Sequence, residues 1–252
     1  MISPSLNIVI PMAGEGSRFK KAGYTKPKPF INVIGKPMIK WVMENLEVPG
    51  AHFILIARKE HVIAEEELVE TLKKEFPITI ITVDQLTEGT ACTVLFARKY
   101  INNDIPLLIA NSDQWVEFSL DAMLKDAHQN SWDGSILTFT DTDMNPKWSF
   151  AKTNEKREVI EVKEKVAISD KATVGIYFFS KGRDFVDGAI DMIVHNERVN
   201  NEFYTCPVYN RAVKNGLLIG IYDIPASAMH GLGTPEDLDS FLFWKQTHPS
   251  KI

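Results

Sequence analysis

Short, unbroken apolar runs constrain the first half of this chain more than any other feature. They occupy residues 6–12, 52–57, 78–83 and 106–111, and helical patterns near 37–46, 60–75 and 91–100 separate them. Strands that are covered on both faces carry such continuous apolar runs, as in parallel sheets with crossover helices. Residues 1–130 are therefore expected to form a doubly wound α/β unit.

The second half has a different pattern. Strand-like segments at 135–141, 147–153, 158–164 and 171–180 follow one another closely, which predicts antiparallel strands added to the same sheet. Helices are expected near 182–195 and 204–215, and a strand at 217–224 follows them. Thr234 as N-cap, with Pro235 next and acids in the first turn, predicts a last helix.

The sequence contains no linker, repeat or low-complexity tract, so residues 1–252 are expected to form a single domain. The predicted fold class is α/β, with three layers and a mixed, mostly parallel, Rossmann-like sheet. Ligands of such sheets bind at the carboxyl edge of the strands. The loops after the first strands are therefore the places where functional residues are expected.

Composition and charge exclude several function classes. The chain has 28 Lys+Arg and 33 Asp+Glu, a net charge of -5, which argues against general affinity for nucleic acid. Its two cysteines, Cys92 and Cys206, form no CxxC pair, which argues against a zinc site or a disulfide framework. The N-terminal residues lack a basic segment and a long apolar core, and no apolar run approaches ~18 residues. We expect a cytoplasmic protein with no signal peptide and no membrane partner.

The loop after the first strand, residues 11–30, carries the clearest chemical signal. Gly14 and Gly16 allow backbone N–H groups to approach an anion closely. Arg18 offers a forked donor for phosphate oxygens. Lys28 stands between two prolines, which places a cation on a stiffened, extended segment. The loop is therefore predicted to bind phosphate.

Two better-known glycine motifs do not fit this loop. A dinucleotide-binding GxGxxG would need a third glycine where Phe19 stands, and a P-loop would need Gly-Lys-Ser/Thr after Gly14. A merely solvated surface loop is the remaining alternative, since most single charges lie on the surface. Glycines, cations and Pro-Lys-Pro occurring together in the expected ligand loop favour a functional site over that alternative.

The same string resembles the signature loop of the sugar-phosphate nucleotidyltransferases: a strand, G-x-G-[ST]-R, P-K-P, and then K-P-hydrophobic. The residues that carry the resemblance are Gly14, Gly16, Ser17, Arg18, Pro27, Lys28, Pro29, Lys36, Pro37 and Met38. The resemblance implies the nucleotide-diphospho-sugar transferase fold. It also implies that Arg18 holds the triphosphate, that Lys28 contacts the phosphates during transfer, and that the loop backbone binds the nucleotide through Ala13, Gly14, Gly16 and Ser17.

Two further segments of the first half resemble the same family. Residues 85–91 are similar to its base-recognition segment, which implies that Gln85, Gly89 and Thr90 face the nucleobase. Glycine there would permit a close approach of the base. Residues 111–114 resemble the G-D-[NQ] segment, whose aspartate binds Mg²⁺, and this implies a metal-binding role for Asp113.

Acceptor-binding segments of the family are recognisable in the second half. Glu164-Lys165 resembles E-K-P, and residues 174–177 resemble [AT]-G-[IL]-Y, which implies acceptor binding by Glu164, Lys165 and Gly175. Glu202 matches an acceptor-contacting glutamate loosely. Val166 replaces the family's proline and the spacing from Lys165 to Gly175 is short, so the acceptor pocket is expected to differ from that of the common sugar enzymes.

Residues 229–238, MHGLGTPEDL, resemble W-x-D-x-G-T-x-x-x-L. In the family the aspartate of this motif is a second Mg²⁺ ligand, and here Gly231 takes its position. Mg²⁺ can bind through one carboxylate together with substrate phosphates. Asp113 is therefore expected to be the main protein ligand of a metal that arrives with the NTP, with Asp223 and Glu202 as candidate further carboxylates.

The reaction that the resemblance implies joins a nucleotide from an NTP to a phosphorylated acceptor and releases pyrophosphate. The acceptor phosphate is already largely ionised at neutral pH, so cations and Mg²⁺ are needed rather than a Ser-His pair. The acceptor is expected to be a sugar 1-phosphate. The sequence also resembles nucleotidyltransferases encoded with bacterial surface-polysaccharide genes, some of which are cytidylyltransferases that act on non-sugar phosphates such as phosphoglutamine.

Other functions stay open at the level of the sequence. A glycosyltransferase of related fold would typically show Asp-x-Asp, whereas Trp115 occupies the second position after Asp113. A non-catalytic nucleotide-sugar sensor and a homo-oligomer are both compatible with the sequence. Trp115, Trp148, Tyr177 and His230 could either contact a ligand or pack in the core.

Overall fold

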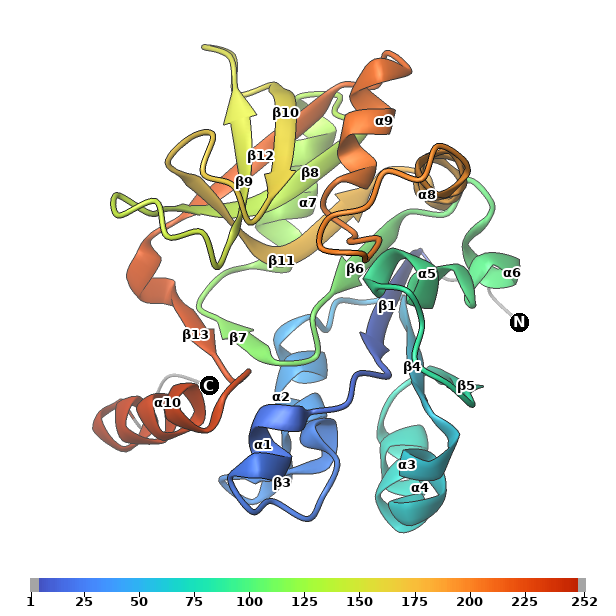
Figure 1. Cartoon of the computed structure of the whole chain (residues 1–252), viewed down its shortest axis with the longest axis vertical. Coiled ribbons are helices and arrows are strands. Elements are labelled where there is room, and N and C mark those ends of the chain that lie inside the picture. Colours follow the sequence, from blue (N-terminus) through green and yellow to red (C-terminus); the bar gives the residue numbers. More distant parts are fainter. Residues whose placement is uncertain (1–4, 249–252) are drawn as a thin grey trace.

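The computed structural model describes residues 5–248, and a mixed nine-stranded sheet runs through it (Figure 1). The strand order is β10-β9-β11-β6-β1-β4-β5, with β8 paired to β11 and β12 paired to β8. The strands of this sheet are β1 (Leu6–Met12), β4 (Ala51–Arg58), β5 (Ile78–Val83), β6 (Leu107–Ala110), β8 (Gly134–Thr140), β9 (Ser149–Thr153), β10 (Val159–Glu164), β11 (Lys171–Phe179) and β12 (Ile219–Ile224).

The core of this sheet is parallel. β1 pairs with β4 on one side and with β6 on the other, and β4 pairs with β5, all in parallel. β11 then joins β6 antiparallel, with Ile176 opposite Ala110. The predicted α/β class with a mixed sheet is confirmed. Because β1, β4, β5 and β6 run in the same direction, the loops that follow them lie at one edge of the sheet.

Helices cover both faces of the sheet and give it three layers. Neighbouring residues of β1 alternate between the faces: Ile8 and Ile10 belong to one buried apolar cluster and Val9 to the other. The first cluster includes residues of α2 (Met38–Asn45), α4 (Glu66–Glu75) and α7 (Leu120–Gln129). The second includes residues of α5 (Thr90–Leu95), α6 (Arg98–Ile101), α8 (Gly182–Val194) and α9 (Val208–Lys214). Burial on both faces explains the unbroken apolar runs.

Some helices are shorter than their sequence patterns predict. The pattern over 60–75 is divided at Glu65, where the backbone leaves the helical region between α3 (Lys59–Ala64) and α4. The pattern over 91–100 is likewise divided into α5 and α6. α9 begins only at Val208. Residues 205–207 form a turn in which Val208 N–H donates to the Thr205 carbonyl, and before it Phe203 N–H donates to the Glu88 carbonyl while Ala91 N–H donates to the Phe203 carbonyl.

A third apolar cluster joins the two ends of the described chain. It packs α10 (Pro235–Thr247) against α1 (Ser17–Lys21) and α2 through buried residues that include Phe19, Trp41, Leu238 and Phe241. α10 begins as predicted, with the Thr234 hydroxyl accepting a hydrogen bond from Asp237 N–H at 3.0 Å. In Figure 1 this helix lies beside the ribbon of β7 (Gln114–Val116) and β13 (Met229–Gly231).

Two smaller features complete the fold. A short ribbon of β2 (Asn32–Val33) and β3 (Lys36–Pro37) precedes α2, and two short 3₁₀ turns are η1 (Lys28–Phe30) and η2 (Ala226–Ala228). Between residues 5 and 248, no helix combines the length and the apolar character that crossing a membrane requires.

Candidate active site

The glycine-rich loop lies at the carboxyl edge of the sheet. β1 ends at Met12, and α1 begins at Ser17 and carries Arg18 on its exposed side. The chain then folds back, so that a Cβ placed on Gly16 would lie 3.2 Å from the Cβ of Lys28. The loop therefore brings Arg18 and Lys28 to the same end of β1.

Lys28 connects this loop to the segment that follows β6. Its Nζ donates to Asp113 Oδ2 at 2.7 Å, and the two side chains are only 21% and 22% exposed. The fold thus brings together the lysine expected to contact phosphates and the aspartate expected to bind metal. Opposite charges in such a partly buried setting stabilise each other more than they would in water.

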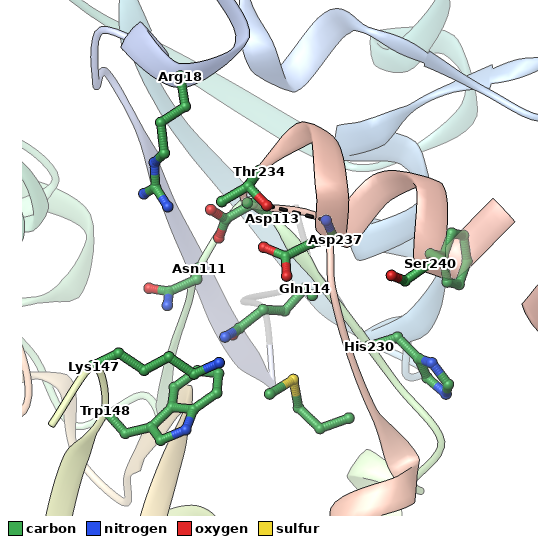
Figure 2. Close-up of a pocket in the computed structure, with 14 residues that line it drawn as sticks. Arg18, Asn111, Asp113, Gln114, Lys147, Trp148, His230, Thr234, Asp237 and Ser240 are labelled. Atoms are coloured by element: carbon green, nitrogen blue, oxygen red, sulfur yellow. Dashed lines mark hydrogen bonds between the residues drawn. The ribbon is translucent and has the colours of Figure 1, made fainter. Parts of the chain in front are cut away.

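A first cavity of about 530 Å³ opens beside this pair. Figure 2 shows that Arg18, Asp113 and Asp237 point into one space, with Lys147 and Trp148 on another side of it. The lining residues are Arg18, Asn111, Asp113, Gln114, Lys147, Trp148, Met229, His230, Gly231, Gly233, Thr234, Asp237, Ser240 and Phe241.

Asp237 is a site residue that sequence reasoning missed. Its only sequence signal was the acidic first turn of the last helix. The two further carboxylates that were expected lie elsewhere: Asp223 accepts hydrogen bonds from Thr138 at 2.9 Å and from Lys171 at 2.7 Å, and Glu202 is exposed. Within the described chain, neither of these two lines the first cavity, whereas Asp113 and Asp237 both do.

A second cavity, of about 230 Å³, adjoins the first. Asn111, Gln114, Lys147 and Trp148 line both. The other lining residues of the second cavity are Thr90, Ser149, Glu164, Thr173, Val174, Gly175, Tyr177, Tyr204, Thr205 and Cys206. Of the expected acceptor-binding residues, Glu164 and Gly175 are among them.

Glu164 is a buried carboxyl at the wall of the second cavity, with 8% of its surface exposed. The Ser149 hydroxyl donates a hydrogen bond to its Oε2. Burial raises the pKa of Glu164, while the Ser149 hydrogen bond and the charge of Lys165 lower it in part. The pKa of Tyr177, which lines the same cavity, is raised well above its usual value by burial. The cavity wall therefore offers protonated hydroxyls and one carboxyl.

Gly175 shapes the boundary between the two cavities. Its φ is +91°, and a Cβ there would lie 2.2 Å from Asn111 Nδ2 and 2.7 Å from Gln114 Oε1. Only glycine gives this backbone and leaves room for both amides. Within residues 5–248, Gln114 Oε1 is buried without a hydrogen-bond partner. It is therefore an acceptor at which a donor on a ligand would be favourable.

Lys165 and Glu202 lie outside the linings of both cavities within the described chain. Lys165 Nζ donates to the Tyr204 hydroxyl at 2.8 Å, and this hydrogen bond is the main cause that raises the pKa of Lys165. Tyr204 does line the second cavity, so Lys165 reaches that site only through it. Lys147, which sequence reasoning did not single out, is the lysine that lines both cavities, and its Nζ lies 4.5 Å from the centre of the Trp148 ring.

The structure gives the residues of the predicted base-recognition segment different surroundings. Gln85 is exposed, and Thr90 lines the second cavity, where Thr205 donates to its hydroxyl at 3.1 Å. Gly89 has a φ of +121°, and a Cβ there would lie 2.4 Å from the carbonyl oxygen of Phe203. The close approach that requires glycine is therefore to this neighbouring backbone. Trp115 is also structural, since it packs against His230, Phe241 and Trp244.

The first cavity contains carboxylate oxygens of the kind that bind a hard divalent cation. A Cβ placed on Gly233 would lie 2.9 Å from Asp113 Oδ2 and 3.9 Å from Asp237 Oδ2, so both carboxylates border a space that glycine keeps open. Among residues 5–248, no group of three or more His, Cys, Asp or Glu is gathered as a metal site. Mg²⁺ usually binds through one or two carboxylates together with waters and substrate phosphates. The residues present fit a metal that arrives with a phosphate ligand.

A glycine-rich loop with two cations, placed against a carboxylate at the carboxyl edge of a mixed sheet, is typical of α/β proteins that bind phosphate-containing ligands. The family model described as "Nucleotidyl transferase" matches residues 8–206. The chain belongs to this family.

Solved and curated proteins extend the comparison. The nucleoside-diphosphate-sugar pyrophosphorylase from Vibrio cholerae RC9 is similar in structure, with a TM-score of 0.80 and 26% identity over 94% of this chain and 99% of that one. The "Bifunctional protein GlmU" of Methanococcus maripaludis is 26% identical over 86% of this chain and 49% of its own length. The mannose-1-phosphate guanylyltransferase catalytic subunit beta of Danio rerio is 25% identical over 69% and 50%. The chain thus spans about half the length of these curated relatives.

Proposed function

We propose that this protein transfers a nucleoside monophosphate from an NTP to a phosphorylated acceptor and releases pyrophosphate. The observation that carries the proposal is the 2.7 Å contact between Lys28 and Asp113, which joins the glycine-rich loop to the β6 segment beside two adjoining cavities. The names of similar proteins, a nucleoside-diphosphate-sugar pyrophosphorylase and a mannose-1-phosphate guanylyltransferase, agree with this class.

The chemistry requires charge neutralisation more than proton transfer. An oxygen of the acceptor phosphate attacks the α-phosphorus, and the bond from that phosphorus to the bridging oxygen breaks, so that pyrophosphate leaves with the electron pair. No proton has to be removed, because the attacking phosphate is already ionised at neutral pH. Arg18 and Lys28 offset the charge of the approaching anions and of the leaving group. Mg²⁺, held by Asp113, would supply further positive charge at the phosphate oxygens.

We assign the two substrates to different parts of the site. We assign the NTP to the loop and strands of about residues 1–130, and the acceptor to the second cavity, most of whose lining comes from residues 131–252. The hydroxyls of Ser149, Thr173 and Tyr177, the Glu164 carboxyl and the buried Gln114 oxygen suit a ligand that carries several hydroxyl groups. A carboxyl at the wall disfavours a second anionic group on the acceptor. A sugar 1-phosphate therefore fits better than phosphoglutamine.

Lys147 stands where the acceptor phosphate would meet the NTP, because it lines both cavities. We assign it to the acceptor phosphate, in the place that resemblance gave to Lys165. Lys147→Ala should then raise KM for the acceptor more than KM for the NTP, whereas Lys163→Ala, an exposed lysine on β10, should change neither. An equal rise in both KM values for Lys147→Ala would contradict this role.

Pyrophosphate release tests the proposed function directly. ATP, CTP, GTP and UTP would each be incubated with Mg²⁺ and a panel of sugar 1-phosphates and non-sugar phosphates, with pyrophosphate measured enzymatically. We expect release with one NTP–acceptor pair. Nucleotide binding without pyrophosphate from any pair would indicate a sensor. Release of nucleoside diphosphate from a nucleotide sugar would indicate a glycosyltransferase.

A further inference from the structure

We propose that Asp237 is the second carboxylate ligand of the divalent metal, and that it replaces an aspartate that this chain lacks at Gly231. The inference rests on the proposed function, because the metal is expected to arrive with the NTP. It goes beyond that function because it assigns the second ligand to a helix residue that the sequence motif does not mark.

The position of the Asp237 side chain supports the replacement. A Cβ placed on Gly231 would lie 3.3 Å from Asp237 Cγ. The Asp237 carboxyl therefore fills the space beside position 231 that an aspartate at 231 would enter. Its Oδ2 would also lie 3.9 Å from a Cβ placed on Gly233, the same position that lies 2.9 Å from Asp113 Oδ2. Figure 2 shows the two carboxylates directed into the same cavity.

The backbone holds these two carboxylates in fixed relation. β13 pairs with β7, with Gly231 opposite Gln114, and Leu232 N–H donates to the Asp113 carbonyl at 2.7 Å. Asp237 follows in the first turn of α10, where its N–H donates to the Thr234 hydroxyl. Leu238, the next residue, is buried in the third apolar cluster and anchors the helix. The site is therefore preorganised on packed elements.

Charge provides an independent reason to expect a cation. Within the described residues, the Asp237 carboxylate makes no ion pair and no side-chain hydrogen bond, and it is only partly exposed. Asp113 already has Lys28 as its partner. Asp237 is thus a carboxylate of this cavity without a positive side-chain partner among the described residues, and a nearby cation would favour its charged form. An acid in the first turn of a helix also interacts favourably with the helix dipole, and this is the competing, structural role for Asp237.

Mn²⁺ electron paramagnetic resonance distinguishes the two roles. The probe would be Mn²⁺ with the α,β-methylene analogue of the NTP that supports pyrophosphate release, titrated into the full chain. We expect Asp237→Ala to bind Mn²⁺ in this complex at least ~10-fold more weakly than wild type, the scale seen when metal-site partners are removed. Asp239→Ala, on the exposed side of the same helix, is the matched control and should bind as wild type does.

A swap variant makes the test independent of helix stability. Gly231→Asp combined with Asp237→Ala moves the carboxylate back to the position that the family motif uses, and removing Asp237 Cγ creates the room. We expect this double variant to recover most of the Mn²⁺ affinity. An unchanged Mn²⁺ affinity in Asp237→Ala would overturn the inference. Pyrophosphate release by the wild-type protein would still support the proposed function in that case. A weakened affinity that the swap does not restore, with a lowered Tm, would assign Asp237 to helix stability instead.

Discussion

The two cations of the glycine-rich loop differ in how they are held. Lys28 is fixed by Asp113 at 2.7 Å, whereas Arg18 extends from the exposed side of α1 into the cavity. Arg18 lines the cavity in which we place the NTP phosphates, and Lys28 contacts Asp113, which lines it too. Their side chains act through charge and hydrogen bonds, so removing either should affect transfer more than folding.

We predict that Arg18→Ala and Lys28→Ala each lower kcat/KM by at least ~100-fold, as loss of preorganised charge stabilisation does in other enzymes. Steady-state pyrophosphate release would measure the effect. Lys26→Ala is the control, since Lys26 lies on the same loop but pairs with Glu65 at 2.7 Å rather than with Asp113. Near wild-type turnover in Arg18→Ala or Lys28→Ala, with circular dichroism unchanged, would remove that residue from the site.

Glu164 gives a pH-dependent prediction. Its folded-state pKa lies above the ordinary value of 4.5 because of burial, so between these two values the folded protein binds more protons than the unfolded chain. This residue's contribution to stability is therefore greatest at low pH and falls as pH rises from about 4.5 through the raised pKa.

Glu164→Gln should remove this pH-dependent loss of stability. Urea unfolding midpoints would be measured from pH 4 to pH 8 in steps of about half a unit. With rising pH, the midpoint should fall less steeply in the variant than in wild type. Glu155→Gln, at an exposed glutamate, serves as the control and should follow the wild-type curve. Parallel curves for wild type and Glu164→Gln would show that Glu164 does not contribute in this way.

Single residues of the site were predictable to different degrees. Arg18, Asp113, Glu164 and Gly175 stand in motifs with a physical meaning, and the fold places all of them at the cavities. Asp237 was not predictable as a site residue, because an acid after a helix N-cap has an ordinary local explanation. Its direction toward Asp113 depends on the pairing of β13 with β7, which sequence spacing does not encode.

At the scale of elements, the contact between residues 88–91 and 203–205 connects the two halves of the site. Phe203 donates to the Glu88 carbonyl at 2.7 Å and accepts from Ala91 N–H at 2.9 Å. This pairing holds residues 203–205 against residues 88–91 and positions Thr205 beside Thr90. A helical pattern over 204–215 could not reveal it, because main-chain bonds to a distant segment override local propensity.

Gly89→Ala tests this contact. The new Cβ would enter the Phe203 backbone, and alanine does not readily adopt a φ of +121°, so we predict a loss of at least about 2 kcal/mol of stability. Calorimetry should show weaker binding of NTP and acceptor alike, because the pairing supports both. Gly14→Ala is the control for stability, since a Cβ there meets nothing within 4 Å. A selective loss of NTP binding, with stability intact, would instead support direct base contact at Gly89.

The whole molecule is organised by its continuous sheet. The parallel strands of the first half lead directly into β11, which also pairs with β8 and β9 of the second half. The unbroken apolar runs, separated by helical patterns, predicted the parallel core. The branching at β11 was not predictable, because its register shifts between Thr173 and Tyr177 and no local pattern marks which strand each half of it will pair with.

This continuity leads us to propose that residues 1–252 form one cooperative domain. We expect a single urea transition in which tryptophan fluorescence and far-UV circular dichroism coincide. Trp41 and Trp115 lie before residue 130, and Trp132, Trp148 and Trp244 after it, so fluorescence reports on both halves. Two separated transitions would indicate that the halves fold as independent units.

The packing of α10 on α1 also affects how the protein is made. A ribosome synthesises the glycine-rich loop before α10, and the buried cluster around Phe19 and Trp41 is completed by Leu238 and Phe241 of that helix. A nascent or prematurely terminated chain would therefore expose those aromatic side chains to chaperones and proteases. Chains truncated before Leu238 should therefore be cleaved by added protease faster than the full chain.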